Sequence, residues 1–148
     1  MKLNPDCIRD VLLYLEENLT YKNNSISMEH KEIPIAIVVS NVSENNKHSS
    51  EDVQYSIEKL FEINYIKIKN ISYDKNKYIV SGNIYDITYE GHNFLNNIRP
   101  KNIWEATKSG ASKLGLMSVH ALSTISMKIV EKVVTDPVVI KKIIESIQ

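Results

Sequence analysis

Residues 65–88 form the pattern that most constrains how this chain can fold. Isoleucine alternates with lysine through 65–71, the period-two pattern of a strand with one buried face. The polar run 74–77 predicts a turn. A partner strand can then return through 78–80 and 83–88. The pattern predicts an antiparallel hairpin, whose apolar face has to be covered by other elements.

Two amphipathic helices are predicted before the hairpin. The first begins with Asn4 as the cap and Pro5 in the first turn, and it ends near Leu19. The second begins at Ser49 with acidic residues in its first turn, and Asn64 is placed to end it in a left-handed turn. Their apolar residues recur at helical spacing: Ile8, Val11, Leu12, Leu15 and Leu19 in the first, and Val53, Ile57, Leu60 and Phe61 in the second.

The segment between these helices has two interpretations. Residues 33–39 are rich in β-branched side chains and are typical of a buried strand. A short helix that begins at Pro34 would fit a helix-turn-helix arrangement better. Periodicity cannot separate a strand from a helix in so short a run, so 26–43 stays open. Residues 44–48 are predicted to be a polar loop.

Helices are predicted again after the hairpin. Thr88 is placed to cap a short helix that reaches Arg99, with Phe94, Leu95 and Ile98 facing inward. Residues 103–134 are expected to form one long helix, weakened by its two glycines. Asp136 and Pro137 then end it and open a last helix over 138–147.

This order predicts an α+β fold. We expect a winged-helix-like domain over residues 1–99, with helices and a two- or three-stranded hairpin as the wing. A C-terminal helical tail over 100–148 would pack on that domain or on a partner chain.

Charge and composition narrow the class of protein. Eighteen acidic and eighteen basic residues balance, yet residues 1–98 carry ten Lys/Arg against fourteen Asp/Glu, and 99–148 carry eight against four. The two halves therefore have opposite net charges of −4 and +4. A single cysteine, Cys7, excludes an internal disulfide, and Met1 runs almost directly into a helix start, so a cytoplasmic protein is expected. The uncharged run 114–127 is too short for a membrane span, so no integral membrane insertion is expected.

Several stretches resemble domain-of-unknown-function family 2513, small bacterial proteins often encoded in phages and prophages. They are Cys7–Leu13, Val53–Leu60 with Ile63–Ile66, and Ile87–Leu95 with Ile98, Arg99 and Trp104. Together they span about residues 1–108. Ser56 and Asn64 depart from the family pattern, which usually has histidine and glycine there, and 32–49 is longer than usual. The resemblance implies a winged-helix-like fold and a mobile-element context, without an established activity.

A basic hairpin raises the hypothesis of duplex DNA binding. Its candidate residues are Lys67, Lys69, Lys75, Lys77 and Tyr73, with Gln54 on the preceding helix. These side chains could lie along a phosphate backbone. The alternative is a solvated edge strand whose lysines prevent aggregation. The helix over 50–63 argues against major-groove docking, because its exposed side carries Glu51, Asp52, Glu58 and Glu62.

No enzyme is predicted. The pair Glu90 and His92 has no third catalytic partner. Glu90 is instead expected to interact favourably with the dipole in the first turn of a helix. Gly91, between the two, is expected to permit close packing against the wing. The remaining histidines are dispersed and Cys7 has no partner at ligand spacing, so no metal site is expected. The four glycines are scattered rather than forming a phosphate loop, so no cofactor is expected.

The tail carries a candidate interface of five apolar residues, Leu114, Met117, Leu122, Ile125 and Ile129. This stripe could cover the chain's own core, associate with a second copy or another protein, or make a shallow membrane contact. Two functions follow from these features. The chain is either a DNA-binding regulator that acts through the hairpin, or a non-catalytic protein-interaction module that uses the acidic helix and the C-terminal helices.

Overall fold

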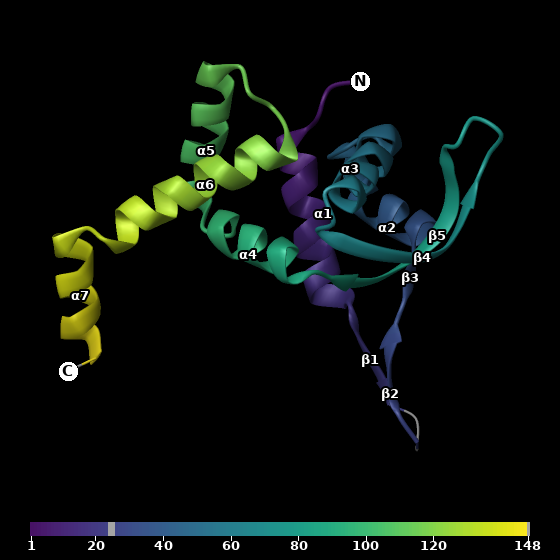
Figure 1. The fold of residues 1–148 in the computed structure, drawn as a ribbon, viewed down its shortest axis with the longest axis horizontal. Coiled ribbons are helices and arrows are strands. Elements are labelled where there is room, and N and C mark those ends of the chain that lie inside the picture. Colours follow the sequence, from purple (N-terminus) through teal and green to yellow (C-terminus); the bar gives the residue numbers. More distant parts are fainter. Residues whose placement is uncertain (24–25, 148) are drawn as a thin grey trace. The chain divides into compact units, whose positions relative to one another are not determined.

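The computed structural model describes residues 1–23 and 26–147 and shows an α+β chain (Figure 1). The chain divides into two compact units, Met1–Leu95 and Asn96–Gln148. The helices are α1 (Pro5–Asn18), α2 (Ile35–Val42), α3 (Ser50–Glu62), α4 (Tyr89–Ile98), α5 (Lys101–Leu114), α6 (Val119–Val134) and α7 (Pro137–Ile147), with a 3₁₀ turn η1 (Glu44–Asn46). Among the described residues, no helix is both long enough and apolar enough to cross a membrane.

Two antiparallel sheets lie in the first unit. Strands β1 (Thr20–Asn23) and β2 (Met28–Lys31) form a two-stranded ribbon. Strands β3 (Ile33–Pro34), β5 (Ile79–Ile87) and β4 (Ile66–Tyr73) form a three-stranded sheet in that order. The pairs Ile33↔Ile84 and Ile66↔Ile87 set its register. All four isoleucines are buried, so one face of this sheet belongs to the core.

Helices α1, α2 and α3 pack on one another and supply the rest of that core. Most of the predicted apolar stripes of α1 and α3 are confirmed, since Ile8, Leu12, Ile57 and Leu60 have no exposed surface. Leu19 and Phe61 were expected in these stripes as well, but they are only half-buried. The predicted caps are confirmed as well. The side chain of Asn4 accepts a hydrogen bond from the backbone N–H of Cys7, and that of Ser49 accepts one from Asp52.

The ambiguous segment contains both a strand and a helix. Residues 33–34 pair with β5, and the chain then turns into α2 at Ile35. The helix forms because Ile35, Val38 and Val42 recur at gaps of three and four and are buried together. The β1–β2 ribbon was not predicted, because almost all of its residues are exposed and show no alternation.

The predicted hairpin is confirmed, and the chemistry of its turn explains its shape. The carboxylate of Asp74 accepts hydrogen bonds from the backbone N–H groups of Asn76 at 2.8 Å and Tyr78 at 3.0 Å. Lys77 has a φ of 66°, so the chain reverses there in the left-handed conformation. Register shifts along β4, with Asn70 also left-handed at φ 55°, add further twist to the strand.

The prediction of one long helix over 103–134 is wrong. Gly115 takes a left-handed φ of 66° and ends α5, and the side chain of Ser118 then caps α6 by accepting a hydrogen bond from Ala121. A glycine at that position costs nothing in the left-handed conformation, so the chain reverses instead of continuing. Helices α5 and α6 pack together, and a Cβ at Gly110 would lie 3.4 Å from Ile125. Asp136 caps α7 as predicted.

Candidate functional site

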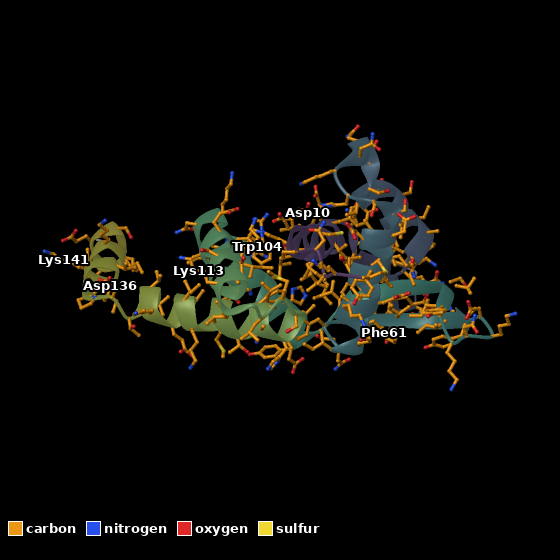
Figure 2. All side chains as sticks on the ribbon, turned by 90° about the horizontal axis from the view of Figure 1, so that it is seen from above. Asp10, Phe61, Trp104, Lys113, Asp136 and Lys141 are labelled. Carbon is orange, nitrogen blue, oxygen red and sulfur yellow. The ribbon has the colours of Figure 1, made fainter. Side chains whose placement is uncertain are left out.

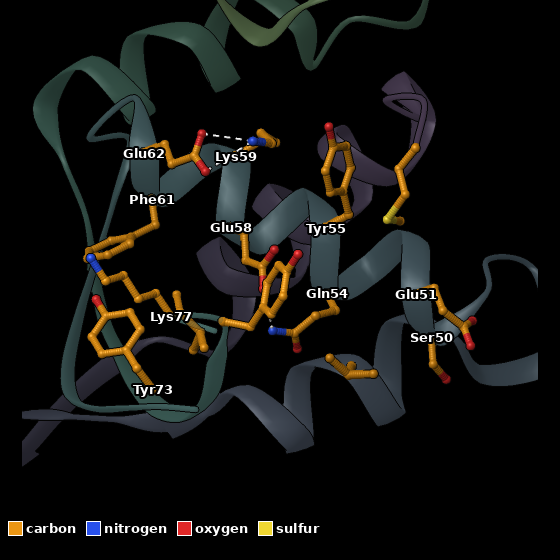
Figure 3. Close-up of a pocket in the computed structure, with 14 residues that line it drawn as sticks. Ser50, Glu51, Gln54, Tyr55, Glu58, Lys59, Phe61, Glu62, Tyr73 and Lys77 are labelled. Atoms are coloured by element: carbon orange, nitrogen blue, oxygen red, sulfur yellow. Dashed lines mark hydrogen bonds and ion pairs between the residues drawn. The ribbon is translucent and has the colours of Figure 1, made fainter. Parts of the chain in front are cut away.

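A groove of about 880 Å³ lies between helix α3 and the tip of the β4–β5 hairpin (Figure 3). We call it the α3 groove. Helix α3 contributes Ser50, Glu51, Gln54, Tyr55, Glu58, Lys59, Phe61 and Glu62, the hairpin contributes Tyr73, Lys77, Tyr78 and Ile79, and Met1 and Val39 complete the lining. Figure 3 shows side chains of α3 facing Tyr73 and Lys77 of the hairpin. The groove therefore lies within the first unit.

The two faces of α3 explain why polar and aromatic side chains gather here. Val53, Ile57 and Leu60 recur at helical spacing and are buried in the core. Gln54 and Glu58 each follow a buried residue by one position, which turns them about 100° around the helix toward the groove that they line. The side-chain amide of Gln54 donates a hydrogen bond to Glu58 at 3.0 Å, which fixes both side chains along the groove.

The hairpin turn positions the opposite wall. Asp74 holds the turn through its carboxylate, and its backbone N–H donates to the carbonyl of Tyr78 at 2.9 Å. This arrangement brings Tyr73, Lys77 and Tyr78 to the tip, where all three side chains are exposed and line the α3 groove. The sequence predicted Tyr73, Lys77 and Gln54 as site residues, and they do come together here.

The groove is acidic on its α3 side. Glu51, Glu58 and Glu62 line it against two cations, Lys59 and Lys77. Lys59 lies 2.9 Å from Glu62 and 5.1 Å from the centre of the Tyr55 ring. The hydrogen bond to Glu62 raises the pKa of Lys59, so this lysine stays charged and neutralises Glu62. The carboxylate of Glu58 accepts its hydrogen bond from the amide of Gln54 rather than from a lysine.

The other predicted hairpin lysines lie away from the groove. Lys69 forms a 2.6 Å ion pair with Glu32, which also accepts a hydrogen bond from Asn83 at 3.0 Å. This contact lowers the pKa of Glu32 and raises that of Lys69. Lys67 stands opposite Asp86 in the register of β4 and β5. Lys75 lies exposed in the turn. The hairpin lysines are thus divided between the tip and the strand, and part of their charge is neutralised.

The predicted tail interface is divided by the helix break. Leu114 ends α5 and Met117 lies in the connection, both exposed, whereas the other three residues lie on α6. Leu122 has no exposed surface, and Ile125 and Ile129 are half-buried. Ile125 faces Gly110 of α5. Leu122 and Ile125 therefore serve the packing of the chain itself in this structure.

The histidines take unrelated positions. His48 is buried, although its segment was predicted to be a polar loop, and its Nε2–H donates to Asp10 at 2.7 Å. His30 lies between the rings of Tyr21 and Tyr85 at 4.8 and 5.6 Å. Within residues 1–23 and 26–147, no group of three or more His, Cys, Asp or Glu side chains is arranged to hold a metal ion.

Cys7 is a core residue of α1 and has no exposed surface. Burial raises the pKa of its thiol from 9.0 to about 11. A thiol that is both protonated and inaccessible is a poor nucleophile. The sequence therefore supplies a cysteine for packing rather than for reaction at this position.

We expect two measurable consequences for Cys7. The native protein should not react with a thiol reagent at pH 8, and should react with one equivalent in denaturant. Because the folded pKa is raised, its contribution to stability is complete below pH 9 and is lost as pH rises toward 11. Between these values the free energy of unfolding should fall by about 1.4 kcal/mol per pH unit more than in Cys7→Ala, as measured by urea titration. Equal slopes in both proteins would contradict this assignment.

Comparison with known proteins assigns most of the chain to a family. The model of the family described as "Hypothetical protein (DUF2513)" matches residues 2–117, from the start of the chain to the connection between α5 and α6. Neither the curated proteins nor the solved structures give a significant match.

Proposed function

We propose that this chain, which belongs to the DUF2513 family, is a non-catalytic protein-interaction module that binds an amphipathic, lysine-bearing helix in its α3 groove. The observation that carries this proposal is the composition of the groove. Aromatic and apolar side chains such as Phe61, Tyr73 and Tyr78 form its lining, and carboxylates stand along the α3 side.

The topology of the first unit supports a winged-helix scaffold for this module. Apart from the β1–β2 ribbon after α1 and the turn η1 after α2, helices and strands follow in the order α1, β3, α2, α3, β4 and β5, with the sheet ordered β3-β5-β4. In the DNA-binding form of such a scaffold, α3 would enter the major groove. Here its outer side carries Glu51, Glu58 and Glu62, which would face phosphates at a cost in affinity. The surface therefore favours a positively charged partner over DNA.

A helix is the partner shape that this lining favours. An amphipathic helix binds a groove by inserting apolar residues at positions i, i+3, i+4 and i+7, while charged residues flank the contact. Lysines on such a helix would meet Glu58 and Glu51 at the α3 side, and tyrosine rings can cover lysine stems and contact their cationic heads. Opposite charge gives the complex its selectivity.

This proposal predicts selective binding of defined peptides. We would titrate the protein into fluorescent amphipathic helical peptides that share one isoleucine face and differ only in flanking lysine or glutamate, and measure anisotropy. The lysine peptide should bind and weaken with salt, whereas the glutamate peptide should not bind. Glu58→Lys/Glu62→Lys should raise the dissociation constant at least about tenfold, because Glu58 becomes a cation and the Lys59–Glu62 ion pair becomes two cations.

The control is Glu17→Lys/Glu44→Lys, which makes the same charge change at exposed positions outside the α3 groove. It should bind the lysine peptide as the unchanged protein does. Equal affinity for the two peptides, or equal loss in both double variants, would rule out the groove as a charge-selective site.

A second candidate function is duplex DNA binding through the hairpin. The observation in its favour is that Lys67, Lys75 and Lys77 are exposed on one hairpin. The same titration with a labelled duplex decides between the two. Salt-sensitive duplex binding that Lys67→Glu/Lys75→Glu/Lys77→Glu abolishes would select the DNA regulator, and the absence of duplex binding at low salt would remove it.

A further inference from the structure

Helix α7 exposes an apolar face that the described residues of its own unit, 96–147, do not cover. Ile140, Ile143, Ile144 and Ile147 are between 41% and 79% exposed, and α7 contains no buried residue. These four positions stand at i, i+3, i+4 and i+7, so they lie on one side of the helix. That spacing is the anchor pattern of a helix that binds in a groove.

The polar side of α7 carries two consecutive lysines. Lys141 and Lys142 follow the first of the exposed isoleucines, and Glu145 is the acidic residue among them. Figure 2 shows the side chain of Lys141 projecting from the helix. Its ion pair with Glu145 is 4.0 Å long, and the two side chains are 77% and 61% exposed. A pair so long and so exposed holds its lysine weakly, so the charge can be shared with another carboxylate.

The charges of the two units are complementary. The unit Met1–Leu95 carries ten Lys/Arg against fourteen Asp/Glu, and the unit Asn96–Gln148 carries eight against four. The net charges are therefore −4 and +4. The acidic unit holds the α3 groove with its aromatic lining, and the basic unit holds α7 with its isoleucines. The apolar and basic side chains of α7 are therefore complementary to the aromatic and acidic side chains of the α3 groove.

We infer that the α3 groove of one copy binds helix α7 of a second copy of this chain, an inference that rests on the proposed function of the groove. The exposed isoleucines contact the aromatic lining, and Lys141, which lies at the edge of the isoleucine face, reaches the carboxylates of α3. The contact is heterologous, because the groove and the helix are different surfaces of the chain. If two copies each place α7 in the groove of the other, the result is a closed, symmetric dimer.

Sedimentation velocity of the full chain over a range of concentrations tests the inference. The unchanged chain should associate. Ile143→Asp/Ile144→Asp should weaken association about a hundredfold, because two apolar anchors become charged and face carboxylates. Ser146→Asp adds an acid to the same helix outside the isoleucine anchors and should retain association. All three positions are exposed, so far-UV circular dichroism should be unchanged.

A charge exchange identifies the contact. Glu58→Lys/Glu62→Lys and Lys141→Glu/Lys142→Glu should each weaken self-association, whereas an equimolar mixture of the two variants should form mixed dimers. Cysteines placed at Tyr78 of one chain and Ile144 of another should cross-link with a short bismaleimide, which distinguishes contact between copies from contact within one.

The outcomes separate the two proposals. A chain that stays monomeric while its groove binds the lysine peptide overturns the inference and leaves the proposed function standing. Association that α7 variants abolish but groove variants leave intact also overturns it, since the helices would then pair with each other. If the groove variants keep both peptide binding and self-association, the proposed function and the inference are both overturned.

Discussion

Replacing Gly91 with alanine is expected to lower the free energy of unfolding by about 3 kcal/mol. A Cβ at this position would be built into the carbonyl oxygen of Tyr65 and would lie 2.8 Å from the Cγ2 of Ile87. The carbonyl is backbone and also accepts a hydrogen bond from the N–H of Thr88 at 3.0 Å, so it cannot move without loss. The start of α4 would have to shift away from the sheet.

Helix propensity predicts the opposite sign, since alanine is favoured over glycine inside a helix by about 1 kcal/mol. The steric effect is larger, because the clash is with backbone rather than with a flexible side chain. Gly110→Ala is the matched control, since that glycine is also helical and its added Cβ would meet only Ile125, at 3.4 Å. It should be neutral or stabilising. Urea titrations followed by circular dichroism measure both changes, and equal effects would refute the close approach at Gly91.

Replacing Asp10 with alanine is expected to destabilise the protein by about 2 to 3 kcal/mol. Its carboxylate accepts the hydrogen bond from the Nε2–H of His48 at 2.7 Å. The other ring nitrogen, Nδ1, is buried without a hydrogen-bond partner in the described part of the chain. Removing Asp10 would therefore leave both nitrogens of a buried ring unsatisfied, and the connection from η1 to α3 would lose its link to α1.

Lys47→Ala separates this effect from simple charge loss. Lys47 lies 2.8 Å from Asp10, but its side chain is 67% exposed, so this pair should contribute no more than about 0.5 kcal/mol. A double-mutant cycle of Asp10→Ala with His48→Ala gives the coupling directly. A cycle with no coupling energy, or a loss in Lys47→Ala as large as that in Asp10→Ala, would contradict the assignment.

Local chemistry made most of the first unit predictable. Capping at Asn4 and Ser49, the left-handed Asn64 and the turn at Asp74 each depend on residues within a few positions. The choice between strand and helix stayed open where local preference was balanced. Residues 33–42 suit either a strand or a helix, and the pairing of Ile33 with Ile84 decided how many residues became strand. Gly115 appeared only to weaken a helix, whereas its left-handed φ ends it.

The groove could be predicted only in part. Gln54, Tyr73 and Lys77 are predicted as contacts for DNA, and the structure brings them together with Tyr55 and Phe61, which no pattern in the sequence links to the hairpin. Tyr55 and Tyr78 are 23 positions apart, and their meeting depends on how the hairpin folds back beside α3. The spacing of polar residues along α3 predicts that one face of this helix is not buried in the core. It does not predict that the hairpin tip lies across from that face.

The pairing of β3 with β5 also has a consequence for the rate of folding. Ile33 meets Ile84, so the chain must close a loop of about fifty residues before the third strand can form, at an entropic cost that local hairpins do not have. The β4–β5 hairpin and each helix can form from neighbouring residues within microseconds. Closure by β3 depends on those elements being in place, so we expect this long-range step to be slower than formation of the hairpin or of any single helix.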